Sequence, residues 1–73
     1  MIYRTELKVV DDELEELGIV KTDWAVGYVL LAGVSSWFQD GDHTVINTPV
    51  GAVEIREHID EFTIVMNQYY KNV

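Results

Sequence analysis

The amino-acid sequence predicts an α+β fold: a small antiparallel β-sheet of three to five strands packed by one C-terminal amphipathic helix. Three observations predict it. The first residues alternate between apolar and polar side chains, as in a half-buried strand. Two turn signals, an Asp-Gly pair and the segment TPVG, separate strand-like runs within residues 34–56. Beyond residue 56, apolar side chains recur at helical spacing. The chain of 73 residues is expected to form a single domain, 1–73.

The N-terminal segment, residues 2–10, is predicted to be a strand, because its side chains alternate in character. One side carries Tyr3, Thr5, Leu7 and Val9, and the other carries Arg4, Glu6 and Lys8.

The next segment, DDELEELG, is predicted to form a short acidic helix near residues 12–17. Asp12 can cap it, and Glu15 three residues later completes a capping box. Val10, Leu14 and Leu17 fall on one side at helical spacing, and Gly18 supplies a left-handed end.

Residues 24–38 leave two alternatives open, a helix capped by Asp23 or a strand. Gly27 and Gly33 would each destabilise a helix by about 1 kcal/mol relative to Ala, and the Val, Tyr and Trp content favours strands. The Asp40-Gly41 hairpin signal favours the second alternative. It predicts a meander over about 34–56, in which one strand ends at Gln39, a second runs over 42–48 and a third, AVEIR, follows a type I turn with a bulge.

The C-terminal segment carries the clearest helical pattern. Its apolar stripe consists of Ile55, Ile59, Phe62, Val65, Met66 and Tyr69. Ile64 falls in the polar face, where it is either an ordinary exposed side chain or a contact point.

The segment AVGYVLLAGV, residues 25–34, has consequences for assembly if it is a strand. A strand that is apolar on both faces needs cover on both, and one helix covers only one. We therefore expect the other face to lie against a partner or a second copy, with a homodimer as the simplest arrangement.

Net charge restricts the possible partners. The chain has a net charge of −8 with five basic residues, too few for direct binding to nucleic acid or to an anionic membrane. A basic protein partner is favoured. There is no cysteine, no signal peptide is recognisable, and the longest apolar run is too short to span a membrane. These features indicate a cytoplasmic protein, in the host cytoplasm if it is phage-encoded.

Catalytic and metal-binding patterns are not recognised, and the sequence predicts neither an enzyme nor a cofactor. Ser35 and Ser36 lie in no nucleophile motif, and no glycine-rich phosphate loop precedes a helix. There are two sets of candidate metal ligands. Asp40, Asp42 and His43 in the hairpin lack a known ligand spacing, and Glu54, His58 and Glu61 would share one side of the helix only if it extends back to residue 54. A small enzyme or metal protein is therefore only the third hypothesis.

Acidic residues form three groups, which are interpreted either as ordinary solubilising charge or as a surface for a basic partner. Acids three or four residues apart on a helix lie roughly 5–6 Å from each other, a spacing comparable to that of nucleic-acid charges. Trp37 or Phe38 could add an apolar anchor. The expected partner-binding residues are Asp11, Asp12, Glu13, Glu15, Glu16, Trp37, Asp40, Asp42, Glu57, Asp60, Glu61 and Ile64.

In general character, very short, acidic, cysteine-free and rich in aromatic residues, the chain resembles small proteins of phages and mobile elements. Anti-CRISPR proteins and DNA mimics are examples. This resemblance of composition implies an inhibitor or regulator that binds a basic, possibly nucleic-acid-binding, protein. The alternative is a structural or assembly subunit that self-associates through an apolar sheet face.

Overall fold

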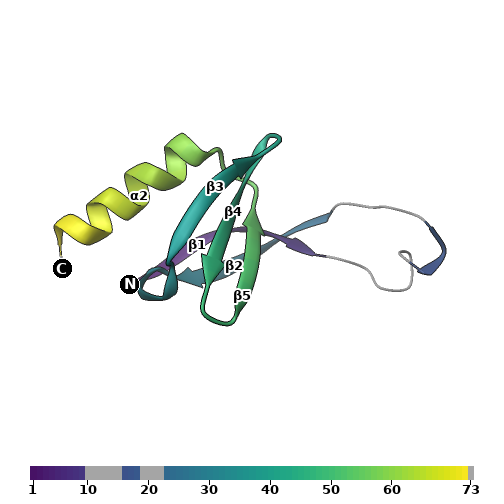
Figure 1. Ribbon diagram of the computed structural model, residues 1–73, viewed down its shortest axis with the longest axis horizontal. Helices are drawn as coiled ribbons and strands as arrows, with labels where there is room; N and C mark the ends of the chain where they lie inside the picture. The colour runs from purple at the N-terminus through teal and green to yellow at the C-terminus, as the bar shows by residue number, and fades with distance from the viewer. Residues whose placement is uncertain (10–15, 19–22, 73) are drawn as a thin grey trace.

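The computed structural model describes residues 1–9, 16–18 and 23–72, and it confirms the α+β fold. A five-stranded antiparallel sheet is packed by one C-terminal helix (Figure 1). The elements are, in order, β1 (Ile2–Val9), β2 (Asp23–Leu30), the 3₁₀ turn η1 (Leu31–Gly33), β3 (Ser36–Asp40), β4 (His43–Thr48), β5 (Gly51–Ile55) and α2 (Ile59–Lys71).

The strand order is β2-β1-β5-β4-β3, so the sheet consists of two parts joined in the middle. One part is the long β1–β2 hairpin, paired from Ile2–Leu30 to Val9–Asp23. The other is the β3–β4–β5 meander. The parts meet at the bridge between Leu7 and Ile55 and at a 3.0 Å hydrogen bond from the Arg56 amide to the Glu6 carbonyl. β2 and β3 are consequently the two edge strands.

Helix α2 covers one face of the sheet and closes the hydrophobic core. Phe62 and Met66 are fully buried in the same cluster as Ile46 and Ile55. Burial of apolar surface at about 25 cal/mol per Å² is the main stabilising contribution to such a core. The cluster also contains Val29, Leu31 and Val34, with Tyr3, Leu7, Trp37, Val65 and Tyr69 packed against it.

Two glycines occupy turn positions that need a positive φ. Gly41 has φ +63° in the β3–β4 turn and Gly51 has φ +139° after the β4–β5 turn, and both are conformations that side chains with a Cβ rarely adopt. The meander was predicted within a residue or two: β4 begins at 43 rather than 42, and β5 covers 51–55 rather than 52–56.

Of the two alternatives for residues 24–38, the favoured strand is confirmed and the helix is excluded, because β2, η1 and the start of β3 occupy them. Two other expectations need correction or completion. Ile55 is not part of the helical stripe, because β5 pairs it with Leu7 and Thr44, and α2 begins only at Ile59. Leu17, which helical spacing places on the same side as Val10 and Leu14, is exposed.

The predicted acidic helix lies largely outside the described residues. Of the predicted segment, only 16–18 are described; Gly18 has φ +76°, which confirms its left-handed conformation. In the described part of the chain, no helix has the length and apolar character needed to cross a membrane.

Candidate functional site

Five predicted carboxylates lie on the β3–β4 turn and around the start of α2, which we call the acidic end: Asp40, Asp42, Glu57, Asp60 and Glu61. Asp42, Glu57 and Glu61 line one groove there, whereas Asp40 lies on the side of His43 and Glu54. The fold brings them together because the β3–β4 turn lies beside the start of α2. The Gln39 side-chain oxygen accepts a 2.8 Å hydrogen bond from the Ile59 amide. The Thr44 hydroxyl donates a 2.7 Å hydrogen bond to the Glu57 carbonyl.

The carboxylates of the acidic end have few cationic neighbours. Asp42 lies 3.3 Å from Nδ1 of His43, and Asp60 lies 3.4 Å from Nδ1 of His58. Both carboxylates extend into solvent. Across residues 1–9, 16–18 and 23–72, the acidic end forms no ion pair with a lysine or an arginine. A surface of this kind retains its negative field.

The remaining described acids near this end behave differently. Glu6 pairs with Arg56 at 3.3 Å, and Glu54 pairs with Lys8 at 3.2 Å. These two carboxylates are therefore largely neutralised within the chain, and we leave them out of the acidic end.

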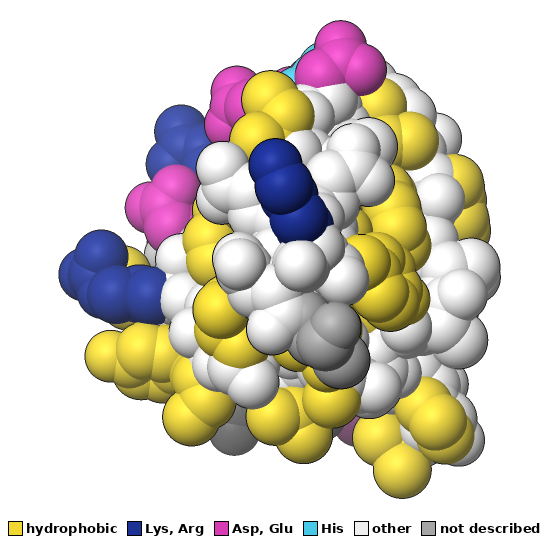
Figure 2. Space-filling model, turned by 90° about the vertical axis from the view of Figure 1, so that its left-hand side faces the viewer, with side chains coloured by type: hydrophobic (Ala, Val, Ile, Leu, Met, Phe, Trp, Pro, Cys, Tyr) yellow, Lys and Arg dark blue, Asp and Glu magenta, His cyan; other side chains and the backbone are white. Residues whose placement is uncertain are grey.

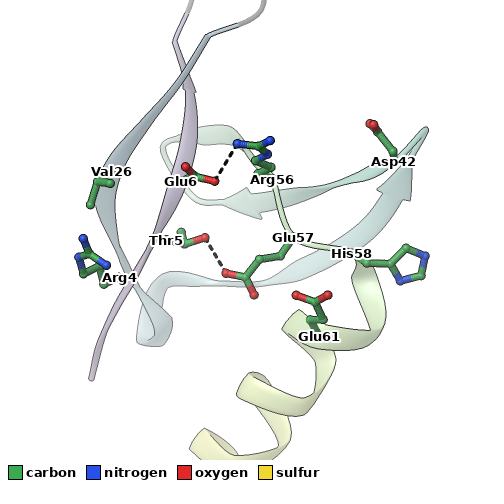
Figure 3. Close-up of a pocket in the computed structure, with 9 residues that line it drawn as sticks. All are labelled: Arg4, Thr5, Glu6, Val26, Asp42, Arg56, Glu57, His58 and Glu61. Atoms are coloured by element: carbon green, nitrogen blue, oxygen red, sulfur yellow. Dashed lines mark hydrogen bonds and ion pairs between the residues drawn. The ribbon is translucent and has the colours of Figure 1, made fainter.

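A polar groove runs between β1 and the segment that leads into α2 (Figure 3). In Figure 3 the Glu57 carboxylate points to Thr5 and the Glu61 carboxylate rises from α2 into the same groove, with Arg4 and Arg56 at its margins. A cationic side chain placed between the two carboxylates would meet negative charge from both. The residues that line the groove are Arg4, Thr5, Glu6, Val26, Asp42, Arg56, Glu57, His58 and Glu61.

Two hydroxyl groups of β1 fix Glu57 in this groove. The Tyr3 hydroxyl donates toward both carboxylate oxygens, at 2.6 and 2.7 Å, and the Thr5 hydroxyl donates to Oε1 at 2.6 Å. Burial, and next the hydrogen bond to Glu57, raise the pKa of Tyr3 well above its usual value of 10.0. Tyr3 therefore remains a neutral donor at physiological pH, and Glu57 is held in place.

A second cluster lies on the opposite face of the sheet from α2. Nε2 of His43 lies 2.7 Å from Glu54, and the imidazole stacks edge-on against Trp24 at 5.5 Å. The hydrogen bond to Glu54 is the main cause that raises the pKa of His43 above 6.5, against the effect of burial. The same hydrogen bond, with Lys8 as a further partner, lowers the pKa of Glu54 below 4.5.

Asp40, His43 and Glu54 could together offer one ligand atom each to a metal ion, since these atoms lie within 4.8 Å of one another. However, Glu54 is already paired with both His43 and Lys8, and an ammonium group beside a ligand opposes a cation. We interpret the cluster as an ion-pair network and take the acidic end as the candidate functional site.

The other predicted partner-binding residues divide into three cases. Asp11, Asp12, Glu13 and Glu15 lie outside the described residues. Glu16 is exposed, in the connection between β1 and β2. Ile64 is exposed on α2, one turn beyond Asp60 and Glu61, so it borders the acidic end.

Trp37 occupies a different position from the one that an exposed anchor needs. Its ring packs against Phe62 at 5.8 Å, and its indole N–H donates a 2.9 Å hydrogen bond to Thr63. Its neighbour Phe38 points to the other face and is exposed. Of the two aromatic residues that the sequence suggested as an anchor, Phe38 is therefore the accessible one.

Two features of the site could not be found from the sequence. The contact between Tyr3 and Glu57 joins residues 54 positions apart, and no local pattern indicates it. Arg4, at the margin of the groove, was interpreted only as the polar side of a strand. Comparison with protein-family models, with curated proteins and with solved structures found no match.

Proposed function

We propose that this chain is a small acidic protein-binding module that inhibits or regulates a basic partner protein by docking its acidic end on that partner. The observation that carries the proposal is the gathering of five carboxylates at one end without a lysine or arginine partner in the described part of the chain. A basic groove that normally binds nucleic acid is the kind of surface that fits it.

The arrangement of the acids supports this kind of partner. Asp60 and Glu61 lie in the first turn of α2, and Asp42 lies in the neighbouring β3–β4 turn. The three therefore present charge from two hydrogen-bonded elements that lie side by side rather than from one unstructured tail. Rigid placement favours specific docking, because little conformational freedom is lost on binding.

Apolar anchors lie on both sides of the acidic end. Ile64 follows the acids by one turn of α2, and Phe38 precedes Asp40 by two residues on the same face of β3. Desolvated apolar contacts supply affinity, while the surrounding charges mainly increase the association rate and the specificity. We therefore assign Ile64 and Phe38 as candidate anchors and the carboxylates as the recognition set.

The proposal can be tested with two variants of equal net charge. One replaces Asp42 and Asp60 with Asn and Glu61 with Gln, and the other replaces Asp12, Glu13 and Glu16 in the same way. With protamine as the basic probe, we expect the first variant to bind at least about tenfold more weakly and the second to change little. Equal losses in both would mean that only net charge matters, and the assignment to the acidic end would be wrong.

Salt supplies a second measurement on the same complex. At about 1 M salt the Debye length is roughly 3 Å, so docking through exposed carboxylates should be lost. A partner captured from lysate should likewise be released by salt and by competing duplex DNA. A partner that remained bound under both conditions would contradict an electrostatic dock on a nucleic-acid-binding surface.

The enzyme or metal hypothesis rests on the two histidines. Replacing both His43 and His58 with Gln should leave protamine binding intact, because neither belongs to the recognition set. If the replacement abolished the protein's activity in the cell while binding was retained, the third hypothesis would gain support.

A further inference from the structure

β2 is an edge strand with unusual features. Its only strand partner among the described residues is β1. From Trp24 to Leu30 it contains no charged residue and no proline. Its outward row is highly exposed: Val26 by 57%, Tyr28 by 66% and Leu30 by 60%. From Trp24 to Leu30 the strand thus presents an edge that no other strand pairs with in the described part of the chain, beside an apolar surface.

The other edge strand, β3, shows what a protected edge looks like. It has five residues instead of eight, and it ends in the carboxylate of Asp40. Monomeric proteins protect sheet edges by short strands, charges, prolines or bulges, because an open edge is a template for another strand. Between Trp24 and Leu30, β2 has none of these devices.

Apolar surface continues from β2 beyond the strand. A shallow apolar groove lies between the end of β2 and the β4–β5 turn, and Val50 at its rim is 99% exposed. Figure 2 shows hydrophobic side chains gathered over the lower part of the face that it presents, with few carboxylates there. The groove is lined by Leu7, Tyr28, Val29, Leu30, Gly33, Thr48, Pro49, Val50 and Val53.

We propose that β2 pairs antiparallel with β2 of a second copy of this chain, with the two-fold axis at Gly27, which joins the two sheets into one of ten strands. This pairing would place Trp24 opposite Leu30 and Val26 opposite Tyr28 of the second copy. The proposal stands independently of the proposed function, because the edge of β2 contains none of the acidic-end carboxylates and shares only Val26 with the lining of the polar groove.

Symmetry and charge together select this register. When a two-fold axis perpendicular to the sheet relates two antiparallel strands, one residue must lie opposite its own copy, and the outward rows of both strands then lie on the same face. With the axis at Gly27, residues 24–30 of one copy pair with residues 30–24 of the other, and Asp23 lies outside the paired stretch. An axis at Val26 would instead place Asp23 opposite Val29 of the second copy.

The second copy is favoured over an unrelated strand because the surface is complementary to itself. In the Gly27 register every cross-strand pair is apolar, and no like charges lie opposite each other. On average about one main-chain hydrogen bond per pair of opposed residues would be formed along the shared edge. The rows of Val26, Tyr28 and Leu30 from both copies would then form one continuous apolar strip, with the two grooves beside it.

Sedimentation velocity on the full chain tests the association. Over about a hundredfold range of protein concentration we expect the mass to rise from 8.4 kDa toward twice that value. Tyr28→Lys should weaken the dimer more than about tenfold. Tyr70→Lys makes the same substitution at an exposed position of α2 and should leave the dimer unaffected. A wild-type chain that stays monomeric, or equal weakening by both variants, would overturn the proposal.

Cysteine crosslinking tests the register without relying on disruptive variants, because the chain has no cysteine of its own. Directly opposed residues in antiparallel strands have Cα atoms about 4.5–5.5 Å apart, a separation that a disulfide spans. We expect a mixture of Val26→Cys and Tyr28→Cys chains to form a covalent heterodimer on oxidation. Rapid crosslinking of Val26→Cys chains with each other, and not of the mixture, would rule out the Gly27 axis.

Discussion

At the scale of single residues, the hydroxyl group of Tyr3 determines how the segment before α2 is held. It donates to Glu57 at 2.6 and 2.7 Å, beside a second donor from Thr5. Removing it would leave a half-buried carboxylate with one donor fewer. Because hydrogen bonds to charged groups contribute about 1.5–3 kcal/mol, we expect Tyr3→Phe to lower the free energy of unfolding by about that amount, as measured by urea denaturation.

Tyr70 provides the matched control for that measurement. Its ring contacts Tyr69, but its side chain is exposed. Tyr70→Phe should therefore change the free energy of unfolding by no more than about 0.5 kcal/mol. If the two variants were equally stable, the hydrogen bonds to Glu57 would contribute nothing to the fold.

The contact between His43 and Glu54 should make the free energy of unfolding depend on pH. The pKa of His43 is raised above 6.5, so its contribution is complete below that pH and is lost as pH rises through the raised value. The pKa of Glu54 is lowered below 4.5, so its contribution is present above that pH and is lost as pH falls through the lowered value. The contact therefore stabilises the fold most between these limits.

We expect His43→Gln to destabilise the fold by up to about 1 kcal/mol near pH 5.5 and by less near pH 9, a magnitude typical of a partly exposed ion pair. Urea denaturation at both pH values measures the difference. The control repeats the substitution in a Glu54→Gln chain, where the pH dependence of the effect should largely disappear. An equal loss at both pH values in the wild-type background would contradict the ionic origin of the contact.

At the scale of elements, what the sequence predicts depends on whether the signal is local. The β3–β4 hairpin follows from Asp40-Gly41, and α2 follows from its apolar spacing, since both signals lie within a few residues. The start of α2 was placed too early because Ile55 fits a helical stripe and a buried strand equally well. Only the distant pairing with Leu7 assigns it to β5.

The same limit applies to the candidate site. The acids were found as separate groups along the chain, because charge is visible in the sequence. Which of them meet could not be predicted, since that depends on the β3–β4 turn reaching the start of α2. Trp37 and Phe38 were correctly placed on opposite faces by strand periodicity, but the face that α2 covers is a tertiary property.

Gly27 of β2 leaves room for the side chain of Leu7 from β1. A Cβ atom at this position would lie 2.6 Å from Cδ1 of Leu7 and 3.2 Å from its Cγ. Leu7 packs against the core, so it has limited room to move. We expect Gly27→Ala to destabilise the fold by about 1–3 kcal/mol through overpacking, as measured by thermal unfolding.

Two comparisons isolate that cause. Gly33→Ala meets nothing within 4 Å, so it should be nearly neutral. In a Leu7→Ala chain, which is itself less stable, Gly27→Ala should cost much less than in the wild type, because the colliding atoms are gone. If the cost were unchanged in that background, overpacking against Leu7 would not be its cause.

At the scale of the whole molecule, charge and apolar surface occupy different elements. The acidic end is built by the β3–β4 turn and the start of α2, whereas the open edge and its apolar row belong to β2. The two proposed interactions should respond in opposite ways to ionic strength. Two copies that each carry a net charge of −8 repel each other, whereas under the proposed function the acidic end would attract a basic partner.

Salt should therefore strengthen dimerisation while it weakens docking. Raising the salt concentration from about 0.05 to 0.5 M shortens the Debye length from more than 10 Å to less than 5 Å. Over this range we expect the dimer dissociation constant to fall and the protamine dissociation constant to rise. Sedimentation velocity and fluorescence anisotropy on the same preparation measure the two constants.

Removing charge at the acidic end should act in the same directions as salt. The Asp42, Asp60 and Glu61 triple variant lowers the net charge of each copy from −8 to about −5, so repulsion between copies decreases while the recognition set is lost. Its dimer should be as tight as the wild type or tighter, and its protamine binding weaker. Tyr28→Lys should show the converse pattern, with a weakened dimer and intact docking. If one substitution abolished both activities in folded protein, the two surfaces would be one, and their separation in the fold would carry no functional meaning.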